Sequence, residues 1–173
     1  MGGIPFERAL NGGSCRDSMN NAALLFNKKL KSLIMELNSN LVQSKFVYAD
    51  VYNMFSHFLV NYQSHGAYVT YLVHQFSRSI YRDMPDISMF IGFENYTTSC
   101  CKTLPGQFRG LLPCNPISEV CSNRSKYVFW DEAHPTDAVN VIFAKKLLDG
   151  DSKDMYPMNL HQLYYENVAR RRF

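Results

Sequence analysis

The most regular hydrophobic pattern in the chain lies between residues 17 and 41. Leucine and isoleucine recur there at steps of three and four residues, while lysine and glutamate occupy the intervening positions. This period is typical of an α-helix with one apolar face, and Asp17 or Ser18 is a suitable N-cap. The pattern therefore predicts a long amphipathic helix that lies on a core. Its apolar positions are Leu24, Leu25, Leu30, Leu33, Ile34, Leu37 and Leu41.

Short runs of β-branched and aromatic residues predict two strands. The first covers residues 45–52 and is apolar on both faces, as in a strand buried in a parallel sheet. A helical stretch follows at residues 53–62. The second strand, residues 126–130, leads to Asp131, and a helix is expected from Pro135 to Asp149 because proline suits a first helical turn. Helices that alternate with strands predict an α/β fold with a parallel sheet.

The other parts of the chain lack a clear period. Residues 1–16 form a Gly-rich lead-in, residues 93–124 a loop rich in Cys, Pro and Gly, and residues 151–173 a polar and aromatic tail. Residues 66–92 begin like a strand and then show neither a helical nor a strand period, so no element is predicted there. The length of 173 residues fits a single domain.

Composition and charge argue against several classes of protein. The chain has 18 Lys and Arg against 15 Asp and Glu, and 46% of its residues are hydrophobic, as in an ordinary globular domain. Its basic residues are scattered apart from Arg170, Arg171 and Arg172, so no nucleic-acid partner is expected. No stretch approaches the roughly 18 apolar residues of a membrane-spanning helix, and no signal peptide is recognisable. We expect a soluble chain without an integral membrane segment, whose oligomeric state the sequence leaves open.

Five cysteines and two N-glycosylation sequons favour a protein that folds in the oxidising environment of the secretory pathway. Four of the cysteines share the loop at residues 93–124, which the sequons bracket, and no CxxC pair or zinc-like spacing occurs. A disulfide set with one cysteine left over is therefore expected. A redox or metal protein is the less favoured alternative. The residues are Cys15, Cys100, Cys101, Cys114 and Cys121, with the sequon asparagines Asn95 and Asn123.

Asp131 and His134 form the main chemical motif of the chain, at the exit of a strand and the entrance of a helix. Their three-residue spacing in a turn allows the carboxylate to accept a hydrogen bond from one imidazole nitrogen, which leaves the other nitrogen as a base. This is the arrangement of the acid and the base in a catalytic triad. Spacing alone leaves a plainer reading open, in which Asp131 stabilises a helix N-terminus by about 0.3–1 kcal/mol and His134 is incidental.

The segment around this motif, residues 127–136 (Tyr-Val-Phe-Trp-Asp-Glu-Ala-His-Pro-Thr), strongly resembles the last motif block of the plant GDSL-type esterase/lipase family, a branch of the SGNH hydrolases. The resemblance extends over nearly the whole chain except residues 66–92, and it corresponds to roughly the C-terminal half of a family member. Further similar segments are residues 2–5 (Gly-Gly-Ile-Pro), 20–30, 45–52, the cysteine loop and 156–159 (Tyr-Pro-Met-Asn).

This resemblance implies one partial domain over residues 1–173 with an α/β fold. That fold would be an incomplete three-layer α/β/α sandwich, SGNH-hydrolase-like and flavodoxin-like, with a mostly parallel sheet. It implies a carboxylic ester hydrolase in which His134 is the general base and Asp131 orients it. The substrate would be a small-molecule or lipid ester, and no metal or organic cofactor is implied. The resemblance also implies that the protein is extracellular and glycosylated and that its cysteine loop forms disulfides.

The chain departs from the family pattern at the nucleophile. No Gly-Asp-Ser block precedes the Asp131–His134 motif, as the nucleophile block of the family does, and the Gly and Asn of the family's oxyanion hole have no counterpart; Gly12-Gly13-Ser14 is interpreted as a turn. The Gly-Asp-Ser tripeptide at residues 150–152 follows the motif and belongs to a different region of the chain. We therefore expect this chain alone to be inactive. The alternative is a non-catalytic remnant or a half-domain that binds acyl ligands or a partner. Residues 67–92 interrupt the match and are expected to be a non-family insert, a translated intron or, alternatively, a lipase lid.

Overall fold

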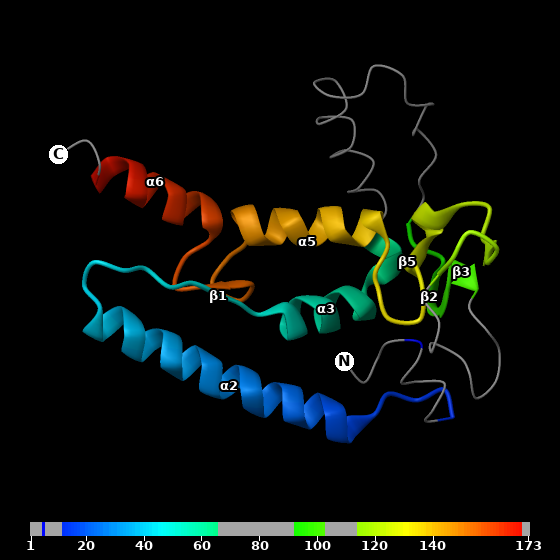
Figure 1. Cartoon of the computed structure of the whole chain (residues 1–173), viewed down its shortest axis with the longest axis horizontal. Helices are drawn as coiled ribbons and strands as arrows, with labels where there is room; N and C mark the ends of the chain where they lie inside the picture. The colour runs from blue at the N-terminus through cyan, green and yellow to red at the C-terminus, as the bar shows by residue number, and fades with distance from the viewer. Residues whose placement is uncertain (1–4, 6–11, 66–91, 103–113, 171–173) are drawn as a thin grey trace, which may run out of the picture. The chain divides into compact units, whose positions relative to one another are not determined.

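The computed structural model describes Pro5 and residues 12–65, 92–102 and 114–170 (Figure 1). The expected insert at residues 67–92 lies outside this part of the chain except for Gly92. Two compact units are distinguished. The first consists mainly of Asp17–His57 and Phe143–Phe173, and the second of Gly2–Arg16 and Phe58–Ile142.

The longest element of the first unit is helix α2 (Asp17–Asn40). Its limits confirm the helix that the hydrophobic period predicted. The expectation that this helix lies on a core is met only in part within the described residues: α2 contains no fully buried residue, but Leu30, Ile34 and Leu37 on one face are half-buried. Periodicity and capping are enough to form a helix, whereas burial also needs a second element that covers its apolar face. Leu25, Leu33 and Met35 are therefore exposed.

The predicted strand at residues 45–52 is much shorter in the structure and has an antiparallel partner. Strand β1 (Tyr48–Ala49) pairs antiparallel with β6 (Met155–Tyr156). Helix α3 (Val51–Val60) begins directly afterwards, because the Asp50 carboxylate accepts the Asn53 N–H at 3.0 Å and caps the helix. The 3-10 helix η1 (Tyr62–His65) extends the helical stretch that was expected at residues 53–62.

The C-terminal region is helical where a polar tail was expected. Helix α6 (Leu160–Arg170) follows a reciprocal cap, in which Asn159 Oδ1 accepts the Gln162 N–H and Gln162 Oε1 accepts the Asn159 N–H. This is a capping box with asparagine in the N-cap position. Helix α5 (Asp137–Asp149) confirms the predicted helix but begins two residues after Pro135.

In the second unit, short strands occur where an irregular loop was expected. Strand β2 (Asn95–Ser99) pairs parallel with β5 (Tyr127–Phe129), and β3 (Cys101–Lys102) pairs antiparallel with β4 (Glu119–Val120). The 3-10 helix η3 (Arg124–Lys126) leads into β5. Residues with no hydrophobic alternation of their own become strands here because a partner strand supplies their hydrogen bonds.

Two disulfides and a small apolar cluster hold this second unit together. Cys100 is bonded to Cys121 and Cys101 to Cys114, whereas Cys15 takes part in neither bond. The rings of Phe58 and Phe93 meet edge to face, with centroids 5.3 Å apart. The buried apolar side chains of this unit include Phe58, Phe93, Val128, Phe129, Val139 and Ile142.

The expected fold class is confirmed only at its coarser level, as helices combined with small sheets. Among the described residues one strand pair is parallel and two are antiparallel, so the sheet structure is mixed rather than mostly parallel. None of the helices in this same part of the chain has the length and apolar character that a membrane span requires.

Candidate active site

The turn between β5 and α5 brings the Asp131 carboxylate and the His134 imidazole into direct contact. Nδ1 of His134 lies 2.9 Å from Oδ1 and 2.8 Å from Oδ2 of Asp131. Because a carboxylate only accepts hydrogen bonds, Nδ1 carries the shared proton and Nε2 keeps its lone pair when the ring is neutral. The Asp131 side chain is only 10% exposed and that of His134 is 74% exposed. The imidazole is therefore held from one side and open on the other.

The pKa of Asp131 reflects opposing effects. Burial by itself raises the pKa of this carboxyl. The backbone N–H groups of His134 and Ala133, together with the hydrogen bond and charge of the His134 ring, outweigh burial and bring the pKa below its ordinary value. Asp131 is accordingly ionised at neutral pH and able to stabilise a protonated imidazole.

Backbone hydrogen bonds close the turn on both sides of this pair. The Trp130 N–H donates to the His134 carbonyl at 2.8 Å. Thr136, which is fully buried, donates its N–H to the Val128 carbonyl and its hydroxyl to the Tyr127 carbonyl, each at 2.9 Å. The Asp-x-x-His segment therefore forms a loop closed by backbone hydrogen bonds, and α5 begins only after it. Thr136 had no predicted role in the sequence.

The lowered pKa predicts how stability depends on pH. A carboxyl with a lower pKa in the folded state adds stability above its unfolded pKa, near 3.9, and this stability is lost as the pH falls through the folded value. We expect wild type to be more stable than Asp131→Asn at pH 6, with the difference shrinking as the pH is lowered to 4 and then 2. Urea unfolding midpoints of the two proteins measure this difference. A gap that stays constant over this range would contradict the assignment.

A second His–Asp contact lies in the first unit, where no motif predicted it. His161 Nδ1 is 2.6 Å from Asp149 Oδ1, and both side chains are 50% exposed. The Asp149 carboxylate contacts the His161 ring, and the Asp131 carboxylate accepts two backbone N–H groups in addition to its contact with the His134 ring. Water competes for an exposed contact of this kind, so it orients the imidazole less well. The His161–Asp149 pair therefore serves as a comparison for the His134–Asp131 pair.

The other groups singled out in the sequence lie in surface positions or in the disulfides. Asn95 Oδ1 accepts the N–H groups of Thr97 and Thr98, and Asn123 Oδ1 accepts the Ser125 N–H, so both sequon side chains are ordered by their own turns. Ser14, in the expected turn, is exposed. No group of three His, Cys, Asp or Glu side chains within the described ranges is arranged to hold a metal ion.

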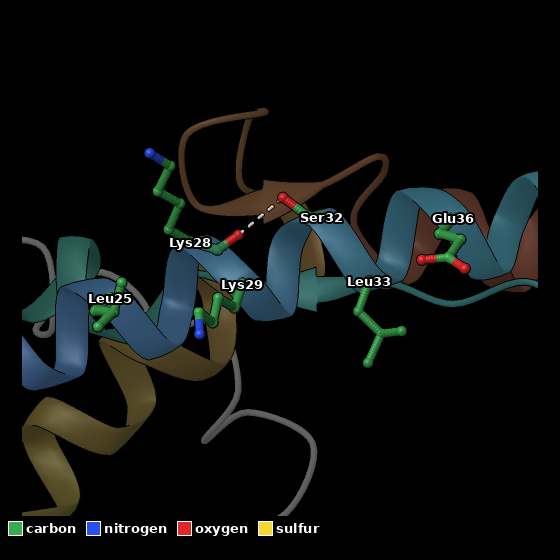
Figure 2. A pocket seen from close by; sticks show the side chains of 6 residues that line it. All are labelled: Leu25, Lys28, Lys29, Ser32, Leu33 and Glu36. Atoms are coloured by element: carbon green, nitrogen blue, oxygen red, sulfur yellow. Dashed lines mark hydrogen bonds between the residues drawn. The ribbon is translucent and has the colours of Figure 1, made fainter.

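A shallow pocket lies along α2, but it contains no comparable chemistry. Figure 2 shows the side chain of Leu33 projecting away from the helix, and Ser32 donating its hydroxyl to the Lys28 carbonyl at 3.1 Å. All the lining residues come from this one helix, and none belongs to the Asp131–His134 pair. The residues are Leu25, Lys28, Lys29, Ser32, Leu33 and Glu36.

Comparison with known proteins finds similar plant proteins. A GDSL esterase/lipase of Arabidopsis thaliana is 42% identical over 166 residues, which covers 94% of this chain and 38% of that protein. Two further Arabidopsis GDSL esterase/lipases are 37% identical, again over 94% of this chain, and are covered to 37% and 36% of their own length. This chain thus spans well under half the length of the curated relatives it matches. No family model and no solved structure matches it.

Proposed function

We propose, on the premise that this chain is a portion of a plant GDSL esterase/lipase, that it supplies the general base and the orienting acid for hydrolysis of carboxylic esters. The observation that carries the proposal is the Asp131–His134 pair, in which a buried carboxylate holds Nδ1 and leaves Nε2 facing solvent. The resemblance of residues 127–136 to the base-and-acid block of the family supports the same roles. Small-molecule or lipid esters are the proposed substrates, and an extracellular location is part of the proposal.

In the proposed mechanism, Nε2 of His134 takes the proton of a serine hydroxyl as its oxygen attacks the ester carbonyl carbon. Asp131 stabilises the imidazolium that forms, and the imidazolium then protonates the departing alcohol. Water, activated by the same nitrogen, hydrolyses the acyl-enzyme. Because no Gly-Asp-Ser block precedes the Asp131–His134 motif, and the tripeptide at residues 150–152 follows it, the proposal places the serine and the oxyanion donors in the portion of the enzyme that lies beyond this chain. A three-layer sandwich formed with that portion is part of the proposal.

A chimera tests this function without requiring the isolated chain to be active. In the Arabidopsis relative that is 42% identical, the aligned segment is replaced by this chain. We expect the folded chimera to hydrolyse p-nitrophenyl butyrate, whereas the relative without that segment and this chain alone do not. A chimera with a cooperative thermal transition but no hydrolysis above buffer would refute the proposal.

A second candidate function is a non-catalytic half-domain that binds acyl groups or a partner. The exposed apolar side chains of α2, which include Leu25 and Leu33, are the observation in its favour. The same chimera separates the two candidates, because a binding half-domain would leave it folded and inactive.

We further propose that the expected insert, residues 67–92, is not needed by this portion of the enzyme, and that a deletion of residues 66–91 tests this. The residues at its two ends meet: Gly92, with φ +66°, lies so close to Gln63 that a Cβ at residue 92 would overlap the Gln63 carbonyl oxygen. A two-glycine link from His65 to Gly92 should therefore span the deletion. Closing a loop costs about 0.6 kcal/mol for each doubling of its length, so deletion should raise stability by about 1–2 kcal/mol.

Urea unfolding of the deletion variant and hydrolysis by the corresponding chimera check this prediction. Unchanged hydrolysis of both short and long acyl esters is the expected result for an insert. Loss of activity toward long acyl esters alone would instead identify a lid, and loss of the cooperative transition would show that the segment belongs to the fold.

A further inference from the structure

A buried polar contact lies beneath the Asp131–His134 turn and has no part in the chemistry described so far. The hydroxyl of Ser99 donates to Oε1 of Glu132 at 3.1 Å, although the two residues are 33 positions apart. Ser99 is 6% exposed and Glu132 is 4% exposed. A charged side chain is almost never this buried without a specific partner. Glu132 directly follows Asp131, so its burial fixes the direction of the turn at that point.

Two backbone hydrogen bonds continue this contact along the same short segment. The Cys100 N–H donates to the Phe129 carbonyl at 3.0 Å, and the Cys101 N–H donates to the Trp130 carbonyl at 2.6 Å. Both cysteines are in disulfides. Three consecutive residues of a cross-linked segment thus hold the chain from Phe129 to Glu132. The two cysteine N–H groups bond to residues that precede Asp131, whereas the Ser99 hydroxyl bonds to Glu132, the residue that follows it.

We propose that Ser99 and Glu132 are positioning residues that hold the Asp131 carboxylate against Nδ1 of His134. Glu132 lies inward while His134 lies outward on the same turn. When the Glu132 carboxylate is released, the backbone between Asp131 and Ala133 is free to rotate. Rotation moves Asp131 Oδ1 away from the N–H groups of Ala133 and His134 and from the imidazole. The assignment of a catalytic role to this effect rests on the proposed function of the Asp131–His134 pair.

The proportion of the two neutral imidazole tautomers measures this positioning directly in the full chain. ¹⁵N chemical shifts of the histidine rings at pH 8 report the fraction with the proton on Nδ1. In Ser99→Ala and Glu132→Ala we expect the Nδ1–H to Nε2–H ratio of His134 to fall about 2- to 10-fold, which corresponds to the loss of one hydrogen bond. His161, which also contacts an aspartate, is the internal reference in the same spectrum.

Two matched variants complete the experiment. Thr98→Ala removes an exposed hydroxyl from the same strand, and Glu132→Gln keeps an oxygen that can accept from Ser99; both should leave the His134 ratio unchanged. In the double variant Ser99→Ala/Glu132→Ala, the ratio should fall no further than in the larger of the single changes, because the two groups share one contact.

The proposal is overturned if a folded Ser99→Ala or Glu132→Ala protein keeps the wild-type ratio at His134, or if His161 changes equally. It is also overturned if both variants lose their cooperative thermal transition, because the pair would then support the fold and not the turn. This readout requires no hydrolysis. If the His134 ratio falls as expected but the chimera does not hydrolyse esters, only the proposed esterase function is refuted, and the positioning role of Ser99 and Glu132 stands.

Discussion

Replacing His134 by alanine in the folded chimera is expected to abolish ester hydrolysis. Without the imidazole the remaining carboxylate of the pair cannot replace it as the base, since its lowered pKa makes Asp131 a weak base and its side chain is largely buried. Removal of a triad base in a well-studied serine protease lowers kcat by about a millionfold, and we expect a loss of similar order here. The rate of p-nitrophenyl butyrate hydrolysis, measured with excess substrate, gives this loss directly.

His161→Ala is the matched control for this substitution. It removes a histidine of the same type that also contacts an aspartate, from the other unit of the chain. We expect its rate to stay within about twofold of the unmodified chimera, because exposed surface substitutions have small effects. Equal losses in the two variants, or a loss of less than tenfold in His134→Ala, would remove His134 from the role of general base.

Removing both disulfides is expected to produce the largest loss of stability. They join residues that are 21 and 13 positions apart. In the chain-entropy model a closed loop of about 15 residues contributes about 3 kcal/mol, so the two nested loops together contribute at most about 6 kcal/mol. A domain of ordinary stability has only about 5–15 kcal/mol in total. Replacement of the four bonded cysteines by serine should therefore leave the second unit largely unfolded at 37 °C.

Thermal unfolding of this variant, and of the wild-type chain with and without a thiol reductant, checks the prediction. Cys15→Ser is the control, because Cys15 is exposed and in neither disulfide, and its midpoint should match wild type. An unchanged midpoint in the four-serine variant would show that packing around Phe93 and Phe129 is sufficient. The expected result would favour an oxidising compartment for the working protein.

Features that depend on residues close together in the chain were predicted well. The period of leucines predicted the limits of α2, and the helix after Pro135 was found at α5. The Asp131–His134 contact was also anticipated, because three residues of a turn are enough to bring the two side chains together. In each case the determining geometry spans only a few peptide units.

Strand β5 lies within the strand predicted at residues 126–130 and pairs parallel, whereas the strand predicted at residues 45–52 was wrong in its limits and its pairing direction. Residues 45–52 have strand-like composition, yet the cap at Asp50 starts α3 and leaves only Tyr48–Ala49 as a strand. The capping box at Asn159 converts an expected tail into α6. Apolar composition does not tell which distant segment a strand pairs with, and a single side-chain cap outweighs a weak β-propensity.

The local sequence was sufficient for helices α2, α3 and α5, for the Asp131–His134 motif and for the relation to plant GDSL esterase/lipases. Only the tertiary structure decided which cysteines pair, that Glu132 lies inward on Ser99, and that the carboxylate of Asp131 is buried while that of Asp149 is half exposed. The physical reason is the range of the interactions. Helix period and turn spacing are set by neighbouring residues, whereas burial, disulfide pairing and the contact between Ser99 and Glu132 depend on segments that meet only after the chain has folded.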